Sequence, residues 1–364
     1  MKTPTLPAPR RFSRISCRSR AKIAKSAGLK IRNLLVPIDF SERSIDLLDY
    51  ARALKRQFGA DLHLVHVYEP DYPLTAMMGM PLALPPVQAG QGVRRHLKDL
   101  AKIRGLDLRP GNVHAIEGRP FEEICRLARA KAIDLIVVST RGNTGLKHLM
   151  LGSTAERIVR YSPCPVLVVH PSGTTKIQTP RSLDFRTILV PIDFSECSLK
   201  GLEYAKALAR KFGSKLVLLN SVTFQFYITN DEYARYDLPL LMEEEEKASR
   251  RQMRNLIEKT DWAGVEVKPS LQIGHAGEQI CARALEHRAD LIVTSTHGIT
   301  GFKHILVGST AEYVVQHASC PVLVVPRHKR PVLNSGGNAK MKPGRRHNPA
   351  TRLSRSGLSR RGLR

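Results

Sequence analysis

The chain contains one long stretch of sequence twice, and this duplication constrains its fold more than any other feature. The segment Ile31–Glu42 returns as Phe185–Glu196, and both copies carry the run Leu-Val-Pro-Ile-Asp-Phe-Ser-Glu. Further along, Thr144–Val169 aligns with Thr300–Val325, and 16 of these 26 residues are identical. The offset between the copies grows from 154 to 156 residues, which is the size of a domain. The repeat therefore predicts two similar domains rather than a solenoid of short units.

Each copy alternates segments typical of strands with segments typical of helices. In the first copy the expected strands are Asn33–Val36, Leu62–Val67, Val113–Ile116, Leu135–Ser139 and Val166–Val169, and the expected helices are residues 42–57, Gly92–Arg104, Pro120–Ala132 and Gly152–Arg160. The second copy repeats this order from Thr187 to Val325. Strands that alternate with helices favour parallel pairing. We therefore predict an α/β fold with two tandem, doubly wound, open parallel sheets of five strands each.

The positive charge of the chain is concentrated at its two ends. Of a net charge of +26, residues 1–30 contribute nine Lys/Arg and residues 327–364 contribute twelve, and neither stretch contains an acid. We expect a basic disordered extension over 1–30, domains over 31–170 and 185–326 joined by a polar linker over 171–184, and a basic disordered tail over 327–364. Such arms attract nucleic acid or another anionic surface without regard to sequence, and salt weakens the attraction.

Cysteine usage and hydropathy bear on where the protein resides. Six cysteines without a CxxC pair are too sparse for a disulfide scaffold or a zinc site, so we expect reduced thiols. No run approaches the roughly 20 apolar residues of a membrane span. The expected location is cytoplasmic. The Arg- and Ser-rich, acid-free start is also typical of organellar transit peptides, and that alternative stays open.

Two polar segments in each copy follow expected strands, at the edge where parallel sheets bind ligands. One is the turn after the first strand, which carries Asp39 or Asp193; the other runs from Ser139 to Thr154 and recurs at Ser295–Thr310. Glycines at a strand exit and at a helix start leave backbone N–H groups accessible to phosphate, and the helix dipole favours the negative charge. The hydroxyls at the helix start add donors, and the aspartate can accept a hydrogen bond from a base or a ribose. Alternatively, the glycines serve only as turn and helix-start residues.

With these motifs the chain resembles the universal stress protein family over residues 31–170 and 185–326. The resemblance rests on the Val-Pro-Ile-Asp-Phe-Ser-Glu opening, the glycine/serine loop and the closing Cys-Pro-Val-Leu-Val-Val strand. It implies an ATP-binding loop of the form Gly-x2-Gly-x9-Gly-Ser/Thr. Both copies match this form except at its first position, where Ser139 and Ser295 replace glycine and narrow the space for the ribose. The resemblance also implies a base contact at the end of the second strand, at Val67 or Ser221.

The resemblance and the motifs together give one set of candidate nucleotide-binding residues, without catalytic residues or metal ligands. They are Asp39, Val67, Ser139, Arg141, Gly142, Gly152, Ser153 and Thr154 in the first copy, and Asp193, Ser221, Ser295, His297, Gly298, Gly308, Ser309 and Thr310 in the second. The cofactor is ATP, with or without Mg²⁺. The resemblance further implies that the closing strands Val166–Val169 and Val322–Val325 pair within the chain, as an internal pseudo-dimer. A homodimer of such chains stays open.

The leading functional hypothesis is a nucleotide-binding stress-response module with little or no catalysis. A P-loop of the form GxxxxGK[ST] is absent, and no carboxylate pair or Ser/His/Asp arrangement is recognisable. A slow ATP-hydrolysing enzyme, or one that transfers phosphoryl or adenylyl groups, uses the same scaffold and stays open, because a fold does not decide function. Association with nucleic acid through the basic ends is the third hypothesis.

Overall fold

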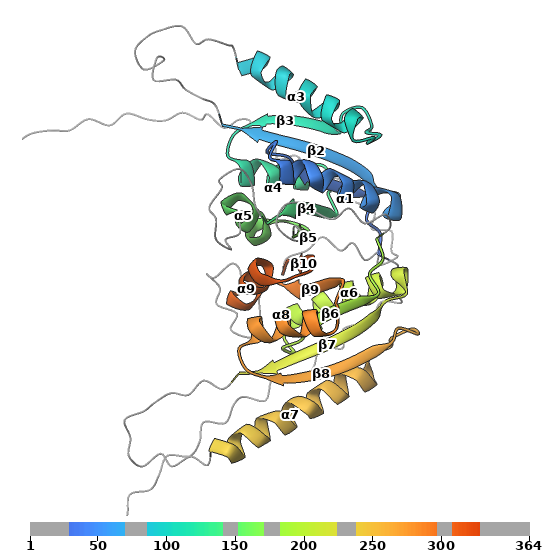
Figure 1. The fold of residues 1–364 in the computed structure, drawn as a ribbon, viewed down its shortest axis with the longest axis vertical. Coiled ribbons are helices and arrows are strands. Elements are labelled where there is room, and N and C mark those ends of the chain that lie inside the picture. The colour runs from blue at the N-terminus through green and yellow to red at the C-terminus, as the bar shows by residue number, and fades with distance from the viewer. Residues whose placement is uncertain are drawn as a thin grey trace, which may run out of the picture. The chain divides into compact units, whose positions relative to one another are not determined.

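The computed structural model describes residues 29–69, 86–140, 152–170, 183–223, 238–296 and 308–327. Its residues 29–170 are called the first half below and residues 183–327 the second half (Figure 1). The first half contains β1 (Asn33–Pro37), α1 (Glu42–Phe58), β2 (Asp61–Tyr68), α3 (Pro86–Ile103), β3 (Val113–Glu117), α4 (Pro120–Ala130), β4 (Leu135–Ser139), α5 (Ser153–Tyr161) and β5 (Val166–Val169).

The second half repeats this order, which confirms the predicted alternation. Its elements are β6 (Thr187–Pro191), α6 (Glu196–Phe212), β7 (Lys215–Val222), α7 (Leu238–Lys259), β8 (Val267–Ile273), α8 (Ala276–Glu286), β9 (Leu291–Ser295), α9 (Ser309–His317) and β10 (Val322–Val325). The largest departure from the predicted bounds in the first half is α3, which begins at Pro86 instead of Gly92.

The ten strands of the described residues form one sheet. Their order is β3-β2-β1-β4-β5-β10-β9-β6-β7-β8, which can be followed along Figure 1. Within each half neighbouring strands are parallel, as predicted. In the first half the chain adds β2 and β3 on one side of β1 and then β4 and β5 on the other. The strand order thus reverses between β1 and β4, and such a switch point is where open parallel sheets bind ligands.

The two halves join through their closing strands. β5 and β10 pair antiparallel, with Leu167 opposite Leu323 and the flanking valines in register. All four residues of each strand are buried. The predicted pairing of Val166–Val169 with Val322–Val325 within one chain is therefore observed, and the two five-stranded sheets are continuous.

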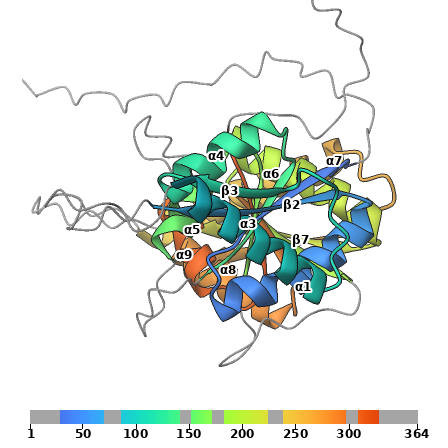
Figure 2. The same ribbon diagram turned by 90° about the horizontal axis from the view of Figure 1, so that it is seen from above.

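The sheet carries one hydrophobic core on each face. One core includes side chains of α1, α3, α6 and α7, and the other includes side chains of α4, α5, α8 and α9. Because successive strand residues point to opposite faces, Leu34 and Val36 pack in the first core and Leu35 packs in the second. Figure 2 shows helices on both sides of the strands. Both cores contain residues of both halves, so the halves fold around shared cores.

Matching end signals define the helix that follows the first strand of each half. Ser41 caps α1 by accepting the N–H of Ser44 on its hydroxyl oxygen at 3.2 Å, and Gly59 ends the helix in the left-handed conformation at φ 63°. Ser195 and Gly213 do the same for α6. These are the residue types that favour helix starts and ends. The duplicated sequence therefore repeats local geometry as well as topology.

Several predictions concern residues outside the described part of the chain, namely the two basic ends over most of their length and nearly all of the linker. The described cysteines carry no disulfide, and burial raises the pKa of Cys164 and of Cys320 to about 12, which keeps both thiols protonated. Within the described ranges, no helix combines the length and the apolar character needed to cross a bilayer.

Candidate functional site

A cavity of about 230 Å³ opens at the switch point between β1 and β4 in the first half. Its lining includes all six predicted residues of this half that the structure describes: Asp39, Val67, Ser139, Gly152, Ser153 and Thr154. The other two, Arg141 and Gly142, lie outside the described residues. Residues that are more than a hundred positions apart in the sequence thus meet at one sheet edge.

The turn after β1 holds Asp39 at this cavity. The Oδ1 atom of Asp39 accepts the backbone N–H of Ser41 at 3.0 Å and the hydroxyl of Ser41 at 2.6 Å. Phe40, between these two residues, has a φ of 59°, in the left-handed region that non-glycine residues seldom occupy. The turn is also tied to β2, because the Nδ1 atom of His66 bonds to the carbonyl oxygen of Ile38 at 2.6 Å. These bonds fix the position of the Asp39 carboxylate.

The start of α5 supplies backbone donors. Gly152 precedes the helix, and no side chain of the described residues caps it. The N–H of Gly152 donates to the carbonyl of Thr140 at 2.9 Å, so this amide already has an acceptor. The candidates for the predicted phosphate contact are therefore the amides that follow Gly152. The amides of Ser153, Thr154 and Ala155 have no intrahelical acceptor, because they belong to the first turn. All three residues line the cavity.

The end of β2 forms another side of the cavity. Pairing between β1 and β2 ends at Pro37 and Val65, and the N–H of Ile38 donates to Val65 O at 2.8 Å. Backbone groups of a strand alternate in direction, so the N–H and C=O of Val67 point to the same side as those of Val65. Val67 lies beyond the last β1 partner and lines the cavity. Its backbone N–H and C=O therefore point toward the cavity, and the base contact at Val67 stays a prediction.

The sequence did not single out the apolar wall of the cavity. Pro120 and Ile124 of α4 and Ile158 of α5 line it, together with Val65 and Val138 from the strands. Pro120 and Ile124 are four residues apart, so they share one face of α4. That spacing was visible in the sequence, but only the packing of α4 over the strand ends shows which side of the cavity it covers. Such a wall suits a flat apolar ring.

The second half repeats the backbone geometry of the site. The Oδ1 atom of Asp193 accepts the N–H of Ser195 at 3.0 Å, and Phe194 between them has a φ of 63°. The N–H of Gly308 donates to Thr296 O at 2.7 Å, as Gly152 does to Thr140. Ser295 ends β9, and Ser309 and Thr310 begin α9. His297 and Gly298 lie outside the described residues.

Side chains around the second copy of the site differ from those of the first. The hydroxyl of Ser221, which stands where Val67 stands in the first half, donates to the carbonyl of Gly274 at 2.9 Å. Tyr313 of α9 packs so closely on Gly277 that a Cβ there would meet its ring at 2.6 Å. In the first half the residue at the Tyr313 position is Arg157, whose guanidinium carbon lies 5.0 Å from the ring centre of Phe121. The side chains packed around equivalent positions therefore differ between the two halves.

A pair of histidines lies on the same face of β2 and β3 as the apolar wall. His63 Nδ1 and His114 Nε2 share a hydrogen bond of 3.2 Å, and their rings stack at 5.5 Å. Burial, with smaller contributions from His63, Lys131 and Arg94, lowers the pKa of His114 to about 4. Burial also lowers the pKa of His63. Both rings are therefore neutral at pH 7.

Comparisons with known proteins agree with this fold. The model of the universal stress protein family matches residues 30–170 and again residues 184–326. Universal stress protein MJ0531 of Methanocaldococcus jannaschii is 30% identical over 145 residues, which is 38% of this chain and 81% of that protein. A universal stress protein of Mycolicibacterium smegmatis is 26% identical over 300 residues, which is 80% of this chain and 96% of that protein.

A solved structure gives the same result for the architecture. The crystal structure of a universal stress protein from Archaeoglobus fulgidus superimposes with a TM-score of 0.54 at 23% identity, and the match covers 83% of this chain and 98% of that one. At this identity the likeness concerns the fold. Since the family model matches both halves along nearly their whole length, the chain belongs to the universal stress protein family and carries two of its domains in tandem.

Proposed function

We propose that the first half binds ATP in the cavity at the β1–β4 switch point and that the protein acts as a nucleotide-dependent regulatory module in the cytoplasm. The observation that carries this proposal is the convergence of an uncapped helix start, a fixed carboxylate and an apolar wall around one cavity. These are the three kinds of group that a nucleoside triphosphate needs: donors for phosphate, an acceptor for hydroxyl or amino groups, and a surface for the base.

The polyphosphate would bind at the start of α5. The free first-turn amides and the hydroxyls of Ser153 and Thr154 donate hydrogen bonds, and the positive end of the helix dipole favours the phosphate charge. Bound Mg²⁺ would neutralise part of the same charge. Because the N–H of Gly152 is already bonded to Thr140, we assign the phosphate contacts to Ser153 and Thr154 rather than to Gly152.

The adenine and the ribose would occupy the opposite side of the cavity. The base packs against the apolar residues Pro120 and Ile124, and its polar edge meets the backbone of Val67. The carboxylate of Asp39 accepts a hydrogen bond from a ribose hydroxyl or from the amino group of the base. Ser139, at the end of β4, lies where its side chain limits the room for the sugar.

Little or no turnover is part of this proposal. Hydrolysis of ATP requires a group that orients water and several charges that stabilise the transferred phosphoryl group. Asp39 is the only carboxylate among the described residues that line the cavity. Its Oδ1 atom already accepts two hydrogen bonds from Ser41, which suits a fixed ligand contact better than a mobile base.

A titration of the full chain with ATP tests the proposal. Ser153→Asp places a carboxylate at the phosphate position; since an acid in the first helical turn is compatible with the helix dipole, the fold should survive. We expect the variant to bind ATP at least about tenfold more weakly, a loss of about 1.4 kcal/mol, because like charges repel at short range. Isothermal titration calorimetry measures the change.

The matched control is Ser309→Asp, at the start of α9 in the second half. It should leave ATP binding by the first half unchanged. If Ser309→Asp weakens binding while Ser153→Asp does not, the site belongs to the second half. If neither variant nor their combination changes the affinity, the helix start does not hold the phosphates and the proposal is wrong.

A further inference from the structure

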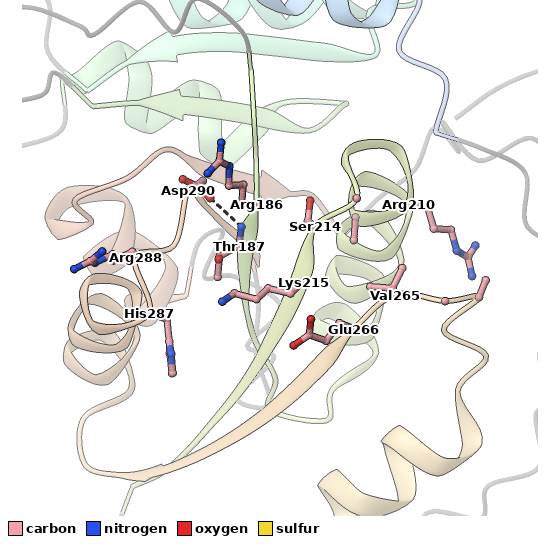
Figure 3. Close-up of a pocket in the computed structure, with 14 residues that line it drawn as sticks. Arg186, Thr187, Arg210, Ser214, Lys215, Val265, Glu266, His287, Arg288 and Asp290 are labelled. Carbon is pink, nitrogen blue, oxygen red and sulfur yellow. Dashed lines mark hydrogen bonds between the residues drawn. The ribbon is translucent and has the colours of Figure 1, made fainter.

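A second cavity lies in the second half, at the amino-terminal ends of its strands. It has a volume of about 830 Å³ and is formed where β6, β7 and β9 begin, beside the ends of α6 and α8. Thr187 and Lys215 open β6 and β7, and Asp290 directly precedes β9. We call this cavity the amino-edge basin (Figure 3), and the residues that line it are 186, 187, 209, 210, 213–215, 263–266, 287, 288 and 290. It is separate from the nucleotide cavity, which lies at the carboxyl ends of strands in the other half.

Positive charge predominates in the amino-edge basin. Its charged lining residues are four cations and two carboxylates: Arg186, Arg210, Lys215, Arg288, Glu266 and Asp290. In Figure 3, Lys215 extends across the middle of the basin, and the three arginines stand on different sides of it. Asp290 is engaged in the fold, since its Oδ2 atom accepts the N–H of Thr187 at 2.8 Å. The lining thus has a formal excess of two positive charges, which attracts anions.

Three of the four cations have no ionic partner among the described residues. Arg186 pairs with Asp184, with a distance of 2.7 Å between Nε and Oδ2. No described carboxylate lies within ion-pair distance of Arg210, Lys215 or Arg288. These side chains are therefore available to an added anion.

Two buried donors in the basin also lack an acceptor. Ser214 is 4% exposed, and its hydroxyl has no hydrogen-bond partner among the described atoms. The Nε atom of Arg210 is likewise buried without a partner, while its Nη2 donates to Asp261 O at 3.4 Å. Buried polar groups are nearly always hydrogen-bonded, so unsatisfied donors beside unpaired cations indicate a missing acceptor.

Several residues of the basin differ from those at the equivalent positions of the first half. Asp61 stands at the position of Lys215, and the Oδ2 atom of Asp61 forms an ion pair of 2.6 Å with Nη1 of Arg109. The neighbouring Ala60 and Ala132 have no side-chain donor, whereas Ser214 and Arg288 replace them in the second half. Lys55 of the first half donates to the carbonyl of Asp107. Arg109 and Lys55 of the first half thus bond within the fold, whereas Lys215 and Arg288 of the second half have no ionic partner among the described residues.

We propose that the amino-edge basin binds a small anion that bears phosphate and at least two negative charges, such as a phosphate monoester or pyrophosphate. Two negative charges match the formal excess of the lining. Phosphate oxygens accept hydrogen bonds from arginine, lysine and hydroxyl donors, which are the unsatisfied groups present. The volume is within the range of small-molecule sites, about 300–1,000 Å³. This binding is independent of the ATP site proposed above.

Trp262 provides a local reporter for the test. It is the single tryptophan of the chain and directly precedes Ala263 and Gly264, which line the basin. Its indole Nε1–H donates to Ile257 O at 2.9 Å, and Lys206 Nζ lies 5.6 Å from its ring. A ligand in the basin should change its fluorescence, whereas an anion in the first half should not.

The experiment is a titration of the full chain with pyrophosphate at an ionic strength of about 0.15 M, where weak surface attraction is largely screened. We expect a saturable change in Trp262 fluorescence. In the double variant Lys215→Asp/Arg288→Ala, which installs the residues of the first half, the affinity should fall at least tenfold. Lys215→Gln removes only the charge, and its affinity for pyrophosphate should lie between that of the unchanged protein and that of Lys215→Asp/Arg288→Ala. The control Arg95→Ala/Lys98→Asp makes the same charge change of −3 at two exposed positions of α3 and should bind as the unchanged protein does.

Three results would overturn the proposal. One is an unchanged affinity for pyrophosphate in Lys215→Asp/Arg288→Ala. Another is an equal loss of affinity in the control Arg95→Ala/Lys98→Asp, which would mean that net charge alone governs binding. The third is the absence of saturable pyrophosphate binding, both by fluorescence and by equilibrium dialysis. If a single-stranded oligonucleotide, and not pyrophosphate, produces the Lys215-dependent signal, the basin is a nucleic-acid surface instead. ATP binding by the first half should be unaffected in every variant.

Discussion

Asp39 and Asp193 occupy the same turn in the two halves, but only Asp39 is proposed to contact a ligand. Each accepts the N–H of a serine two residues later at 3.0 Å, and each turn has a phenylalanine with positive φ. Such aspartates stabilise a turn through their own side chain. The two copies therefore allow the structural role of this carboxylate to be separated from the binding role.

Replacing each aspartate with alanine tests that separation. Both Asp39→Ala and Asp193→Ala should lower the free energy of unfolding by about 1 kcal/mol, because each removes turn hydrogen bonds. Only Asp39→Ala should also weaken ATP binding in the first half. Urea unfolding and calorimetric titration measure the two effects. Equal losses of ATP affinity in both variants would show that the stability of the turn, and not contact between Asp39 and the ligand, determines the affinity for ATP.

Individual site residues were predictable where strand ends determine their position. Asp39, Ser139 and Ser153 follow or precede recognisable elements, so the α/β pattern alone brings them to one edge. The positive φ of Phe40 was not predictable, because it arises from the bonding of the turn rather than from the residue type. The bond from Gly152 to Thr140 was missed for the same reason: a glycine in a loop motif does not reveal whether its N–H is already used.

At the scale of elements, β2 and β3 of the first half carry the His63–His114 pair that the second half lacks. Val217 and Ser270 occupy the same positions in the registers of β7 and β8. Burial keeps both histidines neutral in the folded chain. In the unfolded chain a histidine has a pKa of about 6.5. The folded state therefore binds fewer protons than the unfolded state in mildly acidic solution.

The stability of the protein should consequently depend on pH. Because the pKa of His114 is lowered to about 4, the free energy of unfolding should be constant above about pH 6.5 and fall as the pH drops toward 4. Between about pH 6.5 and about 4 the two histidines should lower the free energy of unfolding by about 1–2 kcal/mol, because solvent reduces the effect of their partial burial. Urea denaturation at a series of pH values measures it.

The variant His63→Val/His114→Ser installs the residues of the second half and serves as the control. It should reduce the slope of stability against pH in this window while keeping β2 paired with β3. An unchanged slope would mean that other groups cause the acid sensitivity.

The elements were largely predictable from periodicity. Strands such as Leu135–Ser139 agree to the residue, because continuous apolar runs between polar turns leave little freedom. The start of α3 at Pro86 was not foreseen, since residues 86–91 carry no charged residue and resemble the preceding residues in composition. The covering of the site by α4 also needed the structure, because amphipathic spacing gives a buried face but not its neighbour.

For the molecule as a whole, the antiparallel pairing of β5 with β10 makes one sheet and two shared cores. Leu323→Asp would place a charge at a buried position, 6% exposed, that lies opposite Leu167. We expect the free energy of unfolding to fall by at least about 3 kcal/mol. The two halves should then unfold in two separate calorimetric transitions. The control Ile273→Asp, at a position 47% exposed on the edge strand β8, should change stability by less than about 0.5 kcal/mol. A single transition in Leu323→Asp would contradict the role given to this junction.

The sequence indicated two domains and paired closing strands, yet it left the register and the inequality of the halves open. Pairing between the equivalent closing strands was implied by the family resemblance, whereas the alignment of Leu167 with Leu323 depends on the packing of both cores. The amino-edge basin was invisible for a related reason. Its cations are unremarkable one by one, and only their placement next to the buried Ser214 hydroxyl gives them a common role.

The most direct test of the account is a crystal structure of the full chain with a non-hydrolysable ATP analogue. It should show the phosphates within hydrogen-bond distance of the amides of Ser153 and Thr154, the base against Pro120 and Ile124, and the ribose or the base near Asp39. A nucleotide bound only elsewhere, for example with its phosphates beside Lys215 in the amino-edge basin, would contradict the assignment of the ATP site to the first half.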